Sequence, residues 1–277
     1  AIEALRLGGG KLITSPLADP LGEDGWDMDG IEATLRQTSP HLAYLIPDFQ
    51  NPTGFLMGDA TRIRYATALR QTRTTAIVDE TLQPTALFDA PMPAPFAAHA
   101  ADAITLGSAS KMFWGGLRVG WIRAPRDLVS RLITARVQFD LGSSLFDQLV
   151  VAELLAQPDI LANRREQLRQ RRDALVTALR EHLPDWRFRV PAGGLTLWLQ
   201  LPHGSATRLC ADMERVGVHL APGPVFSVEG GADGWLRIPY AKPEEDLVRA
   251  VKEVAETWKS LSTRDLDYRK ARQHLIT

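Results

Sequence analysis

The chain has 277 residues, of which 45% are hydrophobic and 23% charged, and its formal net charge at pH 7 is −1. These values are typical of a globular protein and indicate no basic surface for nucleic acid, and no apolar run approaches the roughly 18 residues that span a bilayer. The single cysteine, Cys210, excludes an intrachain disulfide and a cysteine-based zinc site, so we expect a cytoplasmic protein with no membrane partner.

The first half of the chain alternates short β-rich runs with helical patterns. The expected helices lie near Asp29–Gln37 and Asp59–Gln71, and the expected strands are Lys11–Thr14, Leu42–Ile46, Thr75–Asp79, Ala103–Gly107 and Arg118–Arg123. Apolar, β-branched strands that alternate with helices predict an α/β fold, a mostly parallel sheet sandwiched by helices. Functional groups in such folds gather at the carboxyl ends of the strands.

After Arg123 the pattern becomes mainly helical. Helices are expected from Pro125 to about Gln138, from Ser143-Ser144 to about Gln157, and from about Pro158 to His182. Later strands are expected at Arg187–Val190, Thr196–Gln200 and Gly234–Pro239, with helices at Ser205–Val216 and Lys242–Leu261. We therefore expect a large domain over residues 1–160 and a small α+β C-terminal domain over residues 161–277.

The most informative segment is Ser108-Ala109-Ser110-Lys111-Met112-Phe113-Trp114, which continues as Gly115-Gly116-Leu117-Arg118. Lys111 follows an apolar strand-like run and lies between two serines, with an arginine further along. Such an amine can form an imine with a phosphorylated aldehyde, while Ser108, Ser110 and Arg118 hold its phosphate. The segment therefore predicts a site for pyridoxal 5′-phosphate.

Asp79 and Asn51 also lie at or just beyond the ends of expected strands. A carboxylate such as Asp79 can keep the cofactor's pyridine nitrogen protonated, so that the ring accepts electrons. Glu80 competes for this role, and the sequence hardly separates the two acids. Asn51, in Asn51-Pro52-Thr53-Gly54, can donate its amide to the cofactor's phenolic oxygen, although the same tetrapeptide is also common turn chemistry.

Arg237 lies within the apolar run Trp235–Pro239, where an unpaired cation is costly. Its planar guanidinium can bind the α-carboxylate of a substrate with two parallel hydrogen bonds, which explains arginine in place of lysine. The alternative is an arginine on a polar strand face, paired with a nearby acid. The six histidines show no metal-ligand spacing, so no metal is expected.

Together these residues resemble fold-type I pyridoxal phosphate enzymes, the class I/II aminotransferases, almost from end to end. This resemblance implies a Schiff-base and catalytic lysine at Lys111, with Asp79 as its pyridinium partner. The further roles that it implies are a phenolate donor at Asn51, phosphate ligands at Ser108, Ser110 and Arg118, and a ligand for the substrate carboxylate at Arg237.

The lysine segment and Val78-Asp79-Glu80-Thr81-Leu82 also resemble the aminotransferase-like domain of MocR regulators, a GntR subfamily. In that family an N-terminal winged helix-turn-helix binds DNA, and the aminotransferase-like part senses the cofactor or an amine. The resemblance implies an effector domain that binds an amine or amino acid, forms a homodimer, and reaches DNA only through a module absent from this chain. The alternative is a genuine aminotransferase that moves an amino group between an amino acid and a 2-oxo acid.

The sequence departs from the aminotransferase pattern in two places. Aminotransferases usually carry a tyrosine two or three residues after the aspartate, where this chain has Thr81 and Leu82, and this favours a sensor over a catalyst. The first part of the family's domain, with its glycine-rich loop and stacking aromatic, is missing. We therefore expect an N-terminally truncated chain whose own cofactor site is incomplete.

Overall fold

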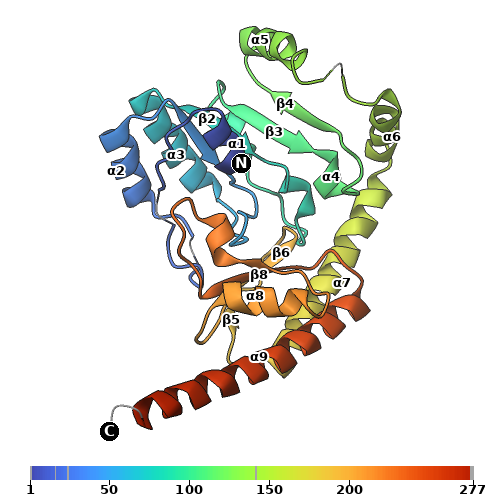
Figure 1. Cartoon of the computed structure of the whole chain (residues 1–277). Helices are drawn as coiled ribbons and strands as arrows, with labels where there is room; N and C mark the ends of the chain where they lie inside the picture. Colours follow the sequence, from blue (N-terminus) through green and yellow to red (C-terminus); the bar gives the residue numbers. More distant parts are fainter. Residues whose placement is uncertain (1, 16, 24, 141, 275–277) are drawn as a thin grey trace. The chain divides into compact units, whose positions relative to one another are not determined.

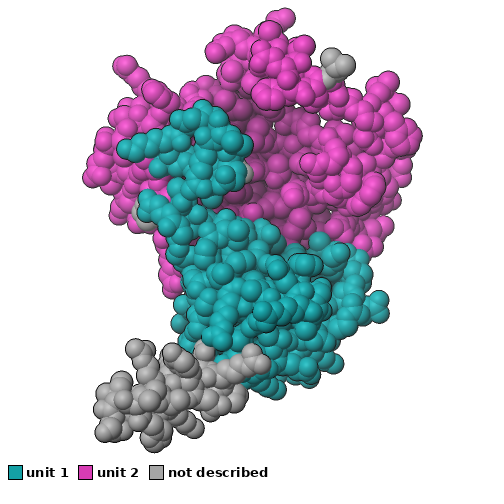
Figure 2. Space-filling model, viewed as in Figure 1, with its two compact units in different colours: residues 1–12, 169–190, 196–277 teal, residues 13–168, 191–195 magenta. Residues whose placement is uncertain are grey.

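The computed structural model describes residues 2–15, 17–23, 25–140 and 142–274 and divides the chain into two compact units. One unit comprises residues 13–168 and 191–195, and the other comprises residues 1–12, 169–190 and 196–277 (Figure 2). Each contains its own four-stranded sheet, so we name the first the parallel-sheet unit and the second the antiparallel-sheet unit.

The sheet of the parallel-sheet unit has the strand order β1-β2-β3-β4, of which β2, β3 and β4 are labelled in Figure 1. Its strands are β1 (Leu42–Leu45), β2 (Thr75–Asp79), β3 (Ile104–Ser108) and β4 (Gly120–Arg123). Strands β1, β2 and β3 are parallel, and β4 is antiparallel to β3. The carboxyl ends of β1, β2 and β3 therefore lie along one edge of the sheet.

Helices α2 (Met28–Thr38) and α3 (Asp59–Thr72) pack against each other in this unit (Figure 1). The Asp27 side chain caps α2 by accepting a hydrogen bond from the amide of Gly30 at 2.9 Å. Helix α2 buries apolar residues from one face, and its last turn is closed by the left-handed Ser39. The core that results contains Ile31, Leu69, Val78 and Phe96.

Three other helices of the parallel-sheet unit are only three or four residues long, and two more follow β4 in the chain. They are η1 (Gln83–Thr85), η2 (Phe96–Ala98), α4 (Ala109–Met112), α5 (Arg126–Arg136) and α6 (Leu145–Leu155). Helix α7 (Pro158–His182) starts in this unit and ends in the other.

Residues 191–195 belong to the parallel-sheet unit although the residues on both sides of them do not. The Leu87 amide donates to Ala192 O at 2.9 Å, and the Gly194 amide donates to Thr85 O at 3.2 Å. Residue 193 must be glycine, because a Cβ there would lie 2.3 Å from the buried Phe49 ring. This short segment is therefore held by backbone hydrogen bonds and by close packing.

The antiparallel-sheet unit has the strand order β5-β6-β8-β7. Its strands are β5 (Arg187–Phe188), β6 (Thr196–Gln200), β7 (Ala221–Pro222) and β8 (Trp235–Pro239), and its further helices are α1 (Ile2–Leu7), α8 (Ala206–Glu214), η3 (Gly223–Phe226) and α9 (Glu244–His274). Leu197, Leu199 and Leu236 of β6 and β8 are completely buried. These side chains form the apolar face that the sheet turns to its core.

The α/β class and the mostly parallel sheet are confirmed, together with the small antiparallel sheet. The expected strand Lys11–Thr14 is wrong, because these residues adopt no regular structure. A strand needs a hydrogen-bonded neighbour, and a four-residue β-branched pattern does not reveal whether one exists. In the described part of the chain, no helix combines the length and apolar character needed to cross a bilayer.

We expect Leu69→Ala to lower the free energy of unfolding by about 2–5 kcal/mol, because it leaves a cavity in the core. Leu69 is 3% exposed, whereas Ile63, on the same helix, is 51% exposed and serves as the control. Urea unfolding of both alanine variants tests this. Equal losses from the two substitutions would contradict the placement of the core.

Candidate cofactor site

Three of the predicted site residues follow three neighbouring strands. Asp79 is the last residue of β2, Lys111 lies in α4 directly after β3, and Asn51 follows β1. Because β1, β2 and β3 are parallel neighbours, all three residues lie at the same edge of the sheet. The fold thus brings an amine, a carboxylate and an amide to one edge of a single unit.

The Asp79 carboxylate is held at both of its oxygens. The Tyr44 hydroxyl, from β1, donates to Oδ2 at 2.5 Å. The amide and hydroxyl of Thr81 donate to Oδ1 at 3.1 and 2.6 Å. Burial raises the pKa of the Tyr44 hydroxyl, and its hydrogen bond to Asp79 raises it further, so this residue remains a neutral donor. These three hydrogen bonds fix the orientation of the carboxylate.

Glu80 has a different structural environment from Asp79. Its Oε1 accepts a hydrogen bond from the amide of Phe96 at 2.8 Å, at the start of η2. Glu80 thus fixes the loop before that helix. This difference favours Asp79 over Glu80 as the partner of a cofactor.

The segment around Lys111 is a tight loop built on α4. The Ser108 side chain caps α4 by accepting a hydrogen bond from the Ser110 amide at 3.2 Å. The Ser110 hydroxyl donates to the carbonyl of Leu117, so it must leave that bond to bind a phosphate. The Lys111 and Arg118 side chains are exposed, and Arg118 Nη1 donates to Gly115 O at 3.3 Å.

Asn51 lies in a compact loop that spans residues 47–57. The Gln50 amide donates to Phe55 O at 2.8 Å, and the Gly54 amide donates to Gln50 O at 2.6 Å. Gly54 has φ = 73°, a left-handed conformation that favours glycine. Asn51 is exposed in this loop, where its amide can reach a bound molecule.

Arg237 lies in β8 of the antiparallel-sheet unit. Its guanidinium carbon lies 4.6 Å from the centroid of the Phe226 ring, in a cation–π contact. Burial lowers the pKa of Arg237. The side chain is therefore partly removed from water, as a ligand of an organic carboxylate should be.

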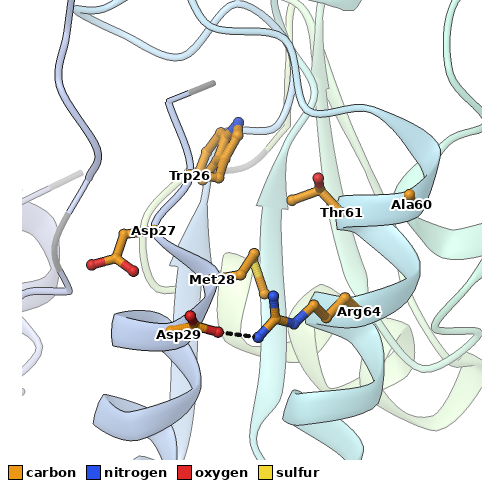
Figure 3. Close-up of a pocket in the computed structure, with 7 residues that line it drawn as sticks. All are labelled: Trp26, Asp27, Met28, Asp29, Ala60, Thr61 and Arg64. Atoms are coloured by element: carbon orange, nitrogen blue, oxygen red, sulfur yellow. Dashed lines mark hydrogen bonds and ion pairs between the residues drawn. The ribbon is translucent and has the colours of Figure 1, made fainter. Parts of the chain in front are cut away.

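A pocket of about 400 Å³ lies elsewhere in the parallel-sheet unit (Figure 3). It is lined by Trp26, Asp27, Met28, Asp29, Ala60, Thr61 and Arg64. The guanidinium of Arg64 is 2.5 Å from the Asp29 carboxylate, and both side chains are substantially exposed. Since none of the predicted site residues lines this pocket, it is separate from the candidate site. Among the described residues, no group of three His, Cys, Asp or Glu side chains could hold a metal ion.

Tyr44 is a site residue that the sequence analysis missed. Its one visible signal is a phenol within the otherwise apolar run Leu42–Ile46. The register that pairs Leu45 with Val78 places this tyrosine beside the end of β2. A strand pairing of this kind cannot be inferred from a single strand.

Comparison with known proteins finds one matching family and relatives of two kinds, aminotransferases and HTH-type transcriptional regulators. The family described as aminotransferase class I and II matches residues 1–254. The 2-aminoadipate transaminase of Thermus thermophilus is 32% identical over 270 residues, which cover 94% of this chain and 67% of that protein. The uncharacterised HTH-type transcriptional regulator YisV of Bacillus subtilis is 30% identical over 249 residues, which cover 87% of this chain and 51% of that protein.

The fold of the chain matches that of a relative of known structure. The crystal structure of LysN, an α-aminoadipate aminotransferase from Thermus thermophilus in complex with N-(5′-phosphopyridoxyl)-L-leucine, superposes with a TM-score of 0.87 and 31% identity. The match covers 95% of this chain and 69% of that chain. The chain has the fold of pyridoxal phosphate-dependent transferases and spans about one half to two thirds of the length of these relatives.

We expect Tyr44→Phe to lower the free energy of unfolding by about 1.5–3 kcal/mol, the value of a hydrogen bond to a charged group. Tyr65→Phe is the control, because Tyr65 is buried in the same unit and packs edge-on against Phe96. Urea unfolding measures both. In an Asp79→Ala background the effect of Tyr44→Phe should disappear, and an undiminished effect there would show that Tyr44 does not act through Asp79.

Proposed function

The chain belongs to the class I and II aminotransferase family, and from this premise we propose that it binds pyridoxal 5′-phosphate as the ligand-sensing domain of an HTH-type transcriptional regulator. The observation that carries cofactor binding is the Asp79 carboxylate, which Tyr44 and Thr81 hold at the sheet edge shared by Lys111 and Asn51. The regulator role is supported by the similarity to HTH-type regulators such as YisV. In this proposal DNA contact belongs to a separate helix-turn-helix module.

The residues of the candidate site fit this cofactor by their chemistry. When bound, pyridoxal phosphate supplies an electron sink for an amino compound attached to it. Lys111 would provide the amine that holds its aldehyde carbon, and Asp79 would face its pyridine nitrogen and favour the protonated form of that nitrogen. Asn51 donates to its phenolic oxygen. The remaining proposed ligands are Ser108, Ser110 and Arg118 for the phosphate and Arg237 for the carboxylate of an amine or amino acid ligand.

The presence of threonine at position 81, and the hydrogen bond that it makes, support a sensor over a catalyst. Aminotransferases usually place a tyrosine hydroxyl near this position, and the Thr81 hydroxyl here donates to Asp79 Oδ1 at 2.6 Å. It is therefore committed to the carboxylate. A bound cofactor would therefore lack the tyrosine donor to its phenolic oxygen, and proton transfer there would be less well supported.

The second candidate function is that of a true transaminase. The 32% identity to 2-aminoadipate transaminase, over 94% of this chain, supports it. In that case Lys111 would also move a proton between the carbon atoms of donor and cofactor, as a general base. For both candidates we propose a homodimer in the cytoplasm, on the basis of family membership.

We expect Lys111→Ala in the full-length protein to abolish the visible absorbance band that appears when pyridoxal phosphate is added. The amine that bonds to the aldehyde is then gone, whereas Lys242→Ala, which changes another exposed lysine, leaves the band intact. Absorbance spectra and borohydride trapping followed by peptide mapping measure this. An unchanged band in Lys111→Ala would refute the assignment of the lysine.

Sensor and catalyst differ in what happens when a single amino acid is supplied with a 2-oxo acid. We expect the full-length protein loaded with pyridoxal phosphate to change its spectrum on binding an amine ligand but to show no sustained turnover. Coupled assays with a panel of amino acids and 2-oxo acids measure this. Sustained turnover with any pair would overturn the sensor proposal and establish the transaminase.

A further inference from the structure

Arg62 is a buried cation in α3. Its side chain is 1% exposed, and its guanidinium donates to three separate segments. Nε donates to Met57 O at 2.8 Å, Nη1 donates to Ala94 O at 3.0 Å, and Nη2 donates to Asp48 Oδ1 at 2.6 Å. The planar shape of the guanidinium lets one side chain serve three acceptors in different directions.

Two of these acceptors mark the two ends of the loop that carries Asn51. Asp48 lies at the start of loop 47–57 and Met57 at its end, and the Met57 amide also donates to Pro47 O at 2.8 Å. Arg62 therefore closes the base of the loop. The exposed Asn51 lies beyond this base, so its position depends on how firmly the base is held.

The hydrogen bond from Arg62 is the main polar contact of the Asp48 side chain in the described part of the chain. Its side chain is completely buried, and among the described residues its Oδ2 has no hydrogen-bond partner. Burial raises the pKa of Asp48 to about 6, although the Arg62 charge opposes this. A buried ion pair of this kind gains little stability, because both charges have lost their water. The three hydrogen bonds of Arg62 to Met57, Ala94 and Asp48 fix relative positions that an apolar side chain would not fix.

We propose that Arg62 and Asp48 are a positioning pair that fixes loop 47–57 and so sets the place of the Asn51 amide at the sheet edge. The inference rests on the proposed function, in which Asn51 donates to the phenolic oxygen of pyridoxal phosphate. Arg62 is buried beneath the loop and acts through Asn51. Arg64, two residues further along α3, pairs with the exposed Asp29 and serves as the matched control.

The first test needs no cofactor. In the full-length protein, Arg62→Lys keeps the charge but cannot reach all three acceptors, so the amides of Gln50, Gly54 and Met57 should exchange hydrogen at least about tenfold faster. Arg64→Lys should leave their exchange unchanged. Unchanged exchange in Arg62→Lys would overturn the proposal. Asp48→Asn, which keeps the size of the side chain, is the second variant if Arg62→Lys does not fold.

The second test separates positioning from a merely structural role. The visible band of the lysine-bound cofactor is titrated with pH in Asn51→Ala, Arg62→Lys and the double variant. We expect Arg62→Lys to shift the titration midpoint in the same direction as Asn51→Ala, with no further shift in the double variant. Additive shifts, or no shift in Arg62→Lys, would overturn the proposal. A wild-type protein without any band would refute the proposed function, while the exchange experiment would still decide whether Arg62 holds the loop.

Discussion

The parallel pairing of β1, β2 and β3 is the constraint on which the candidate site depends. Each parallel strand needs a crossover connection back to the same end of the sheet, which is α3 between β1 and β2 and a loop with η1 and η2 between β2 and β3, so the residues at the ends of these strands gather at one edge. Asn51, Asp79 and Lys111 are separated by about thirty residues in sequence, yet each follows one of these three strands. Asn51 and Lys111 are exposed at this edge, whereas Asp79 between them is partly buried.

A second feature of the site is that its polar groups are held before any ligand arrives. Tyr44 and Thr81 orient Asp79, and Arg62 closes the loop that carries Asn51. The cost of ordering these groups is therefore borne by folding rather than by binding. Lys111 and Ser110 differ from these groups, since the Lys111 side chain is exposed and the Ser110 hydroxyl is bonded to the carbonyl of Leu117.

The sequence predicted the framework of the site better than the contacts that hold it. Strand β2 and Asp79 were predictable because a β-branched run ends there at an acid, and Lys111 was marked by its serines and glycines. Tyr44, Asp48 and Arg62 carry no such local pattern, since their partners lie on other elements and become visible only in the folded chain. Strand β7 and helix α1 were missed for a related reason, because elements this short have no measurable periodicity.

Residues 191–195 complete the parallel-sheet unit, although they come late in the chain. The polypeptide crosses between the units after residues 12, 168, 190 and 195, so no single cut releases either unit as a continuous fragment. During synthesis on the ribosome, which proceeds from the N-terminus, the part of the Phe49 ring that Gly193 packs against stays uncovered until residues 191–195 have been made. The parallel-sheet unit is therefore completed only after residues 169–190 of the antiparallel-sheet unit have been synthesised.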